Sequence, residues 1–260
     1  QPRLGMALSG GGARGIAHIG VLQALREEGI RPQVIAGTSA GAIVGALHAA
    51  GKAPLDMLDF IKDSSMWRII RVGIPYDGLT KLTYLKQRLQ EVLEVDSFDA
   101  LRHQLYITVT NLNTGKVETI SAGSLFDVVV ASSSIPLVFK PVEMNGESYV
   151  DGGLLNNLPV EPLVGNVQHI LGVNAMPNLP VKNKSVQTVF GIATRCFELS
   201  IYANSRKNLE QCSMVISPEK LQQFNIFQFN KYRTIYDIGY ESAQQMMPQI
   251  KSMLQESADT

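Results

Sequence analysis

The sequence contains little of what a disulfide scaffold, a metalloenzyme or a nucleic-acid-binding protein requires. Among its 260 residues there are two cysteines, Cys196 and Cys212, which are too few for a disulfide framework and fit no zinc-ligand spacing. No cluster of metal-ligating side chains is visible, so we expect no metal and no other cofactor. The 23 basic and 23 acidic residues cancel. Because binding to phosphate backbones requires a cationic excess, nucleic acid is not the expected partner.

Charged residues are also scarce, at 18% of the chain, whereas hydrophobic residues reach 45%. A chain of this length and composition can bury a large core, which excludes global disorder. The longest stretch without charge, residues 34–51, is long enough to suggest a membrane span. Four glycines interrupt it, so we interpret it as a buried strand, a turn and a helix. No targeting segment is visible, and we expect a cytoplasmic protein.

Short apolar runs alternate with amphipathic segments, which predicts an α/β fold with a mostly parallel sheet. Strands are predicted over residues 4–8, 34–36, 105–111, 117–121, 142–144, 149–150, 169–174 and 214–217. Helices are predicted over 13–28, 40–50, 55–62, 84–93, 125–131, 187–211 and 232–255. No repeat or linker divides the chain. We therefore expect one domain over residues 1–260, with its motifs within about 4–173 and a helical part over about 186–256.

The sharpest motif is Gly37-Thr38-Ser39-Ala40-Gly41, which fits G-x-S-x-G between a predicted strand and a predicted helix. At such a turn a serine is held in a crowded backbone conformation, and small flanking residues let the strand and the helix approach each other. The hydroxyl then lies beside a helix N-terminus, which favours developing negative charge. Ser39 is therefore a candidate nucleophile. A tight glycine-rich turn without catalytic function is the alternative.

A second glycine-rich turn, Gly10-Gly11-Gly12-Ala13-Arg14-Gly15, has the formal spacing of a dinucleotide fingerprint. That interpretation requires an acidic residue about 20 positions later. No Asp or Glu occurs between Ile30 and Asp56, and no Gly-Lys-Ser/Thr follows as in a P-loop. We favour a different function, in which the consecutive glycine N–H groups bind an anion. Beside Ser39 they would form an oxyanion hole.

A nucleophilic serine needs a base, and the four histidines are poorly placed to serve. His18 and His48 lie inside predicted helices, while His103 and His169 adjoin strand starts. Asp151 instead follows a strand end and precedes Gly152-Gly153, although a simple Asp-Gly turn is the alternative. The ordinary pKa of an aspartate, about 3.9, makes it a weak base. A basic Asp151 would therefore need burial or few hydrogen bonds.

Taken in this order, the GGGARG, GTSAG and DGG motifs resemble the patatin-like phospholipase family. The resemblance extends from Leu4 to about Val173 and includes the segments 17–22, 131–136 and 156–159. It implies a three-layer α/β/α sandwich with a central, mostly parallel sheet. It also implies a Ser–Asp dyad in which Ser39 is the nucleophile and Asp151 is the base. The oxyanion hole would comprise Gly10, Gly11, Gly12, Ala13, Arg14 and Gly15, and the nucleophile turn Gly37, Thr38, Ala40 and Gly41.

We therefore expect a serine lipid acyl hydrolase that cleaves fatty-acyl esters, such as those of a phospholipid or lysophospholipid, through an acyl-enzyme. Two alternatives stay open: an acyltransferase with the same dyad, and a non-catalytic lipid-binding or regulatory module. Residues 66–74 carry two cations and the only Trp, and a loop packed on the core is preferred there over a peripheral membrane contact. For residues 224–229 an ordinary strand or loop is preferred over an acyl site or a partner surface. Ser132–Ser134 is interpreted as a helix end.

Overall fold

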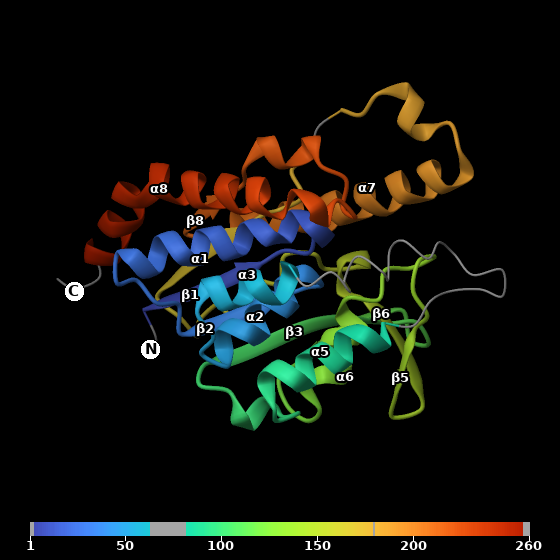
Figure 1. Ribbon diagram of the computed structural model, residues 1–260, viewed down its shortest axis with the longest axis horizontal. Helices are drawn as coiled ribbons and strands as arrows, with labels where there is room; N and C mark the ends of the chain where they lie inside the picture. Colours follow the sequence, from blue (N-terminus) through green and yellow to red (C-terminus); the bar gives the residue numbers. More distant parts are fainter. Residues whose placement is uncertain (1–2, 63–81, 179, 257–260) are drawn as a thin grey trace.

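A computed structural model of the chain describes residues 3–62, 82–178 and 180–256. Its centre is a single sheet with the strand order β5-β6-β3-β2-β1-β7-β8, and β4 pairs with β3 off this path (Figure 1). The parallel strands are β1 (Leu4–Leu8), β2 (Val34–Gly37), β3 (Gln104–Asn111), β7 (His169–Val173) and β8 (Met214–Ile216). The antiparallel strands are β4 (Lys116–Ile120), β5 (Val142–Met144) and β6 (Glu147–Asp151).

The two central strands are buried along their whole length, as their continuous apolar sequences require. Side chains alternate between the two faces of the sheet. On β1, Leu4, Met6 and Leu8 belong to the larger core cluster, while Ala7 belongs to a smaller one on the opposite face. The helices therefore pack against two distinct apolar surfaces.

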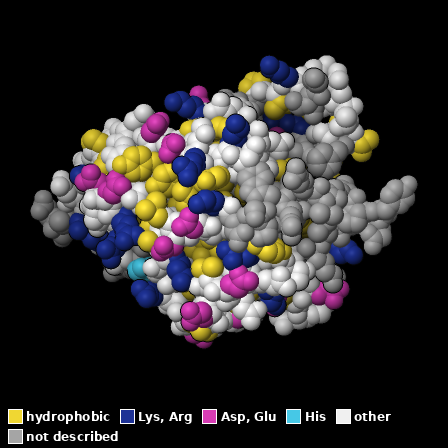
Figure 2. Space-filling model, in the orientation of Figure 1, with side chains coloured by type: hydrophobic (Ala, Val, Ile, Leu, Met, Phe, Trp, Pro, Cys, Tyr) yellow, Lys and Arg dark blue, Asp and Glu magenta, His cyan; other side chains and the backbone are white. Residues whose placement is uncertain are grey.

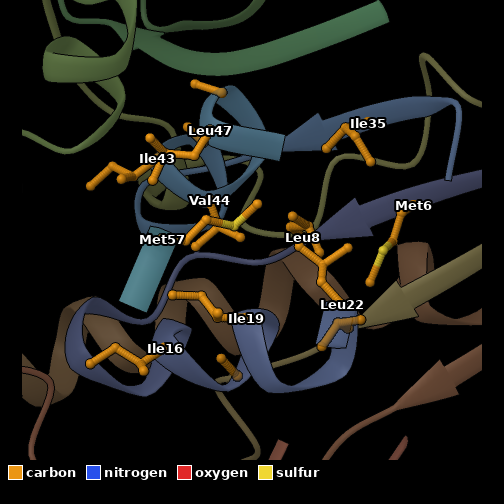
Figure 3. Close-up of a cluster of buried hydrophobic side chains, with 14 of the residues drawn as sticks. Met6, Leu8, Ile16, Ile19, Leu22, Ile35, Ile43, Val44, Leu47 and Met57 are labelled. Carbon is orange, nitrogen blue, oxygen red and sulfur yellow. The ribbon is translucent and has the colours of Figure 1, made fainter. Parts of the chain in front are cut away.

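The larger core lies beneath a layer of helices that covers one face of the sheet. These helices are α1 (Ala17–Glu27), α2 (Ala40–Ala49), α3 (Pro54–Lys62), α5 (Thr83–Leu93), α6 (Leu125–Ser132) and α8 (Tyr232–Glu256). In Figure 3, Ile19 and Leu22 of α1 lie across from Val44 and Leu47 of α2, with Leu8 of β1 between them. This packing fixes the N-terminus of α2 above the end of β2.

The opposite face is covered more thinly. Leu158, Val160, Leu163 and Val167 pack there, from a segment of turns that follows the 3-10 turn η3 (Gly152–Leu154). Leu209, near the end of α7 (Val189–Glu210), completes the cover. The α/β fold with a mostly parallel sheet is thus confirmed, although turns rather than a helix form much of its second outer layer.

The predicted elements agree with the structure to within one or two residues, apart from the first helix. It was predicted over residues 13–28, but a 3-10 turn, η1 (Gly12–Ile16), precedes α1. Gly12 there has a positive φ of 55°. Residues 34–51 form β2, the serine turn and α2, as predicted. Within the described ranges, no helix is long and apolar enough to cross a membrane. Residues 66–74 lie outside those ranges.

Candidate active site

Ser39 occupies the sharp turn between β2 and α2. Its φ of 54° and ψ of −120° are rare for a residue with a side chain, and such backbone geometry costs about 1–3 kcal/mol. Close packing around the turn makes glycine necessary, since a Cβ on Gly37 would lie 2.5 Å from the carbonyl oxygen of Gly41. The neighbouring Thr38 donates its hydroxyl to the carbonyl of Asn156 at 3.0 Å. The turn is therefore held in a strained conformation by its surroundings.

Ser132, at the end of α6, supports the same turn. Its hydroxyl accepts the backbone N–H of Ser39 at 2.9 Å and donates to the carbonyl of Thr108 at 2.7 Å. All three groups are buried. The residue does end a helix, as the sequence analysis proposed, but that interpretation missed its contact with Ser39. The only sequence signal was the likeness of segment 131–136 to the family, which does not specify a contact.

Asp151 is brought to Ser39 by the register of the sheet. Gly37 pairs with Ile107 of β3, and Asp151 pairs with Val109, two residues further along the same strand. Ser39 lies two residues beyond Gly37. The side chains of Ser39 and Asp151 are therefore at the same position along the direction of the strands. The carboxyl accepts a hydrogen bond from the Ser39 side chain and another from the N–H of Gly153 at 2.7 Å.

The environment of Asp151 gives this carboxyl an unusual pKa. Its side chain is almost completely buried, at 2% exposed, and no cation pairs with it among the described residues. Burial raises its pKa to about 7, although the hydrogen bonds from Ser39 and Gly153 act in the opposite direction. A carboxyl with a pKa near neutrality can both accept and return a proton at physiological pH.

The glycine-rich loop that follows β1 lies next to Ser39. A Cβ on Gly10 would lie 3.1 Å from the Cβ of Ser39. Several N–H groups of the loop already have acceptors: Gly10 donates to Asn157, Ala13 to Ile226 and Arg14 to Gly11. Within the described part of the chain, the N–H groups of Gly11 and Gly12 have no acceptor. Fewer backbone N–H groups are thus available to bind an oxyanion than the six residues from Gly10 to Gly15 suggested.

Arg14 has a different environment from the one expected of an oxyanion-hole residue. Its guanidinium donates from Nε to the carbonyl of Phe224 at 2.8 Å and from Nη1 to the sulfur of Met176 at 3.3 Å. Its Nη2 lies 3.8 Å from Glu198. Burial lowers the pKa of Arg14, and Glu198 opposes that shift. The Arg14 side chain therefore connects the glycine-rich loop to the later segments that contain Met176, Glu198 and Phe224.

The histidines do not join Ser39 and Asp151. His18 is buried and its Nε2 lies 2.8 Å from the carbonyl of Ser9, and burial lowers its pKa to about 4. His48 is at the far end of α2, where it stacks on His103 with ring centroids 5.4 Å apart. His169 begins β7, at the opposite edge of the sheet from Ser39. These contacts favour structural functions for His18, His48 and His103, and the position of His169 separates it from Ser39.

Asn157 lies beside Ser39 and Asp151 in the smaller of two cavities, and its only sequence signal is the likeness of segment 156–159 to the family. Its side chain is buried, and neither its amide oxygen nor its amide nitrogen has a hydrogen-bond partner among the described residues. The amide oxygen is so close to Gly10 that a Cβ there would lie 2.4 Å away. Because buried polar groups are rarely left unpaired, this carboxamide is a natural partner for a bound molecule.

Two cavities meet at Ser39. The larger, about 720 Å³ including its solvent-open mouth, is lined almost entirely by apolar side chains, among them Ile43, Leu85, Phe139 and Phe227. The smaller, about 300 Å³, is lined by Asp151, Asn157 and Glu198 together with Phe197. Ser39 thus lies between an apolar space and a more polar one.

The aromatic segment 224–229 contributes to the larger cavity. It forms a loop, the interpretation preferred from the sequence, and Ile226, Phe227 and Phe229 line the apolar space. The alternative interpretation, an acyl site, therefore also has structural support. As for metals, no group of three or more His, Cys, Asp or Glu in residues 3–62, 82–178 and 180–256 could hold an ion.

Solved structures of similar fold include VipD from Legionella pneumophila, with a TM-score of 0.55 and 18% identity over 95% of this chain and 67% of that one. The human GIVD cytosolic phospholipase A2 gives a TM-score of 0.52 and 12% identity, covering 98% of this chain and 62% of that one. At these identities the likeness concerns the fold.

Sequence relatives are closer. An NTE family protein of Mycobacterium tuberculosis is 36% identical over 168 residues, which cover 64% of this chain and 46% of that protein. The lysophospholipase nte1 of Aspergillus fumigatus is 27% identical over 281 residues, covering 96% of this chain and 18% of that protein. The chain thus spans less than half the length of these relatives. Residues 6–164 match the family of patatin-like phospholipases, and the chain belongs to that family.

Proposed function

We propose that this chain is a serine lipid acyl hydrolase that uses Ser39 and Asp151 as a catalytic dyad. The observation that carries the proposal is the hydrogen bond between Ser39, held in a strained turn, and a buried carboxyl whose pKa is about 7. A serine nucleophile needs an adjacent base, and this carboxyl has both the position and the basicity. Membership of the patatin-like phospholipase family supports the same chemistry.

The reaction would proceed in two steps. Ser39 Oγ attacks the acyl carbonyl carbon while the Asp151 carboxylate accepts the hydroxyl proton. Asp151 then returns this proton to the departing alcohol oxygen, which leaves an ester between Ser39 and the fatty acid. Water then attacks that ester while Asp151 again accepts a proton. Asp151 passes this proton to Ser39 Oγ as the bond between Oγ and the acyl carbon breaks, which releases the fatty acid and restores the serine.

The negative charge that forms on the carbonyl oxygen would be stabilised by backbone donors. Gly11 and Gly12 are the residues of the glycine-rich loop with N–H groups free of acceptors among the described residues. The N–H of Ala13 is bonded to Ile226 at 2.7 Å and is less available. One preorganised donor of this kind is typically worth about 10²–10³ in rate. We assign the oxyanion hole to Gly11 and Gly12 on this basis.

We infer a substrate with one fatty-acyl chain, such as a lysophospholipid. One apolar cavity adjoins Ser39 in the described ranges, and it suits a hydrocarbon chain. The smaller cavity, with Asn157 and Glu198, would take the polar alcohol portion. The fungal relatives are named lysophospholipases, which agrees with this assignment. Asn157 would donate its amide N–H to an oxygen of that portion.

The test is a lipid panel assayed with the wild type and with Ser39→Ala. We expect release of fatty acid from monoacyl phospholipids faster than from diacyl phospholipids, and none with the variant. Normal turnover by folded Ser39→Ala would overturn the proposal. Adding a short alcohol and analysing the products separates a hydrolase from an acyltransferase, because a transferase would form the new ester in preference to free fatty acid.

A further inference from the structure

A third cavity lies far from Ser39, at the opposite edge of the sheet. It is enclosed by the end of α1, the segment leading into β2, the end of α2 and the segment leading into β3. Ser39 begins α2, whereas this cavity is at the other end of that helix. Ten helical residues span about 15 Å, so the two sites are separate. The cavity encloses about 680 Å³ including its open mouth.

The lining of this cavity is strongly cationic. It includes Arg26, Arg31, Lys52, Arg102, His48 and His103. Among the residues that the structure describes, no acidic side chain lines it. Figure 2 shows dark blue side chains gathered beside a histidine at the left of the molecule, the end at which α1 and α2 terminate in Figure 1. The chain as a whole has zero net charge, so this cavity is a local concentration of positive charge.

These cations are not neutralised by the protein. Among the described residues, the side chains of Arg26, Arg31, Lys52 and Arg102 make no hydrogen bond or ion pair. The acidic residues closest in sequence are Glu27, Glu28, Asp56 and Asp99, and among the described residues none of them lines the cavity. Asp56 accepts the backbone N–H of Ala53, which does line it. Glu27 accepts from Tyr240, and Glu28 pairs with Lys251.

A purely structural explanation is that these cations stabilise the C-termini of α1 and α2. Each helix end carries roughly −0.5 of a charge, so the two ends offset about one of the four cations. A net positive charge of about three therefore faces the cavity, before any protonation of the histidines. Burial lowers the pKa of His48, its bond to Pro32 raises it, and the neighbouring His103 lowers it further.

The Arg102 side chain lies beside the turn that follows α2. Arg102 lies over Gly51, whose missing Cβ would be 2.8 Å from the Arg102 Nη1. The absent side chain thus leaves the guanidinium room beside the turn that follows α2. Guanidinium groups bind phosphate oxygens in pairs, and an ammonium such as that of Lys52 adds a point charge.

We propose that this cavity is a binding site for a phosphate-bearing ligand, with Lys52 and Arg102 as its principal anchors. A phosphomonoester carries a charge of about −1.5 to −2 at pH 7, so four cations can accommodate more than one phosphate group. We therefore expect a diphosphate to bind more tightly than a monophosphate. The ligand can be a small phosphate ester or a phosphorylated lipid headgroup, because the recognised chemistry is the same.

The test uses the whole chain with two kinds of probe. Inorganic phosphate and pyrophosphate are titrated by calorimetry at low ionic strength, and binding to phosphatidylcholine vesicles is compared with and without phosphatidic acid. Saturable binding in the first arm identifies a small phosphate ester, and binding confined to phosphatidic acid vesicles identifies a headgroup. Absence of binding in both arms would overturn the proposal.

A matched pair of variants distinguishes this site from general charge effects. Lys52→Gln/Arg102→Gln should weaken binding by about tenfold or more, because two charge-assisted contacts are lost. Arg206→Gln/Lys207→Gln removes the same charge from exposed positions of α7 and should change affinity less than about twofold. Equal losses in the two variants would refute the site. If the first variant does not fold, Arg31→Gln alone provides the comparison.

Discussion

Replacing Asp151 by asparagine separates the chemistry of this side chain from its effect on folding. The amide keeps the shape but cannot serve as the base, so kcat should fall by about 10²–10⁴. The same change removes a buried carboxyl whose pKa is about 7, against an ordinary value of 3.8. Because the folded protein holds this proton more tightly than the unfolded chain, the associated stability is complete below pH 3.8 and is lost as the pH rises to about 7.

The size of this effect can be worked out from the linkage relation. Between pH 5 and pH 8 the wild type should lose about 3 kcal/mol that the Asp151→Asn variant does not lose, at about 1.4 kcal/mol per pH unit within the window. For a chain of this length that difference corresponds to about 6–12 °C in Tm. The other carboxyl groups titrate in the same way in both proteins, so their contributions cancel in the difference between the two stabilities.

The assay is thermal or urea unfolding of both proteins at pH 5, 6, 7 and 8. We expect the variant to gain stability relative to the wild type as the pH rises, although it is catalytically inactive. A stability difference that does not change between pH 5 and pH 8 would refute the raised pKa. A variant that retains normal activity would refute the assignment of Asp151 as the base.

Four further predictions test other parts of the site. Ser39→Gly should abolish hydrolysis but stabilise the protein by about 1 kcal/mol, because glycine tolerates a φ of 54°; a lower Tm would contradict the inferred strain. Ser132→Ala leaves the Ser39 N–H unpaired and should lower both kcat and stability, the latter by about 1–3 kcal/mol, as measured by kinetics and urea unfolding. Gly12→Val would place a Cβ 2.3 Å from the Ile226 carbonyl oxygen, and we expect slower hydrolysis and slower fluorophosphonate labelling; micromolar NAD binding with an unchanged esterase rate would favour a nucleotide site instead. Activity should survive EDTA, and loss on chelation that a divalent ion restores would contradict a metal-independent mechanism.

The sequence predicts the architecture well because the strands of this sheet are short and apolar. The run Leu4–Leu8 and the strand at Val34 are recognisable as buried strands, and glycines mark where they end. The first helix was predicted to start too early, because the 3-10 turn at Gly12 has the same apolar spacing as the helix that follows it. Periodicity does not distinguish these two conformations over a single turn.

The candidate site was only partly predictable. Ser39 stands in a motif with a clear physical rationale, and Asp151 follows a strand end. That they lie together depends on the pairing of β6 with β3 and of β3 with β2, which no local pattern encodes. The functions of Ser132 and Asn157 likewise depend on contacts between segments far apart in sequence. The cationic cavity was missed for the same reason, since its residues come from three separate connections and the helix ends beside them.

The most direct test of the central claim is covalent labelling with a fluorophosphonate, followed by mass spectrometry of the labelled peptides. A single adduct should form on Ser39, and its rate of formation should rise with pH through about 7 as Asp151 loses its proton. The Ser39→Ala variant should not be labelled. An adduct on another serine, or undiminished labelling of that variant, would contradict the assignment of Ser39 as the nucleophile.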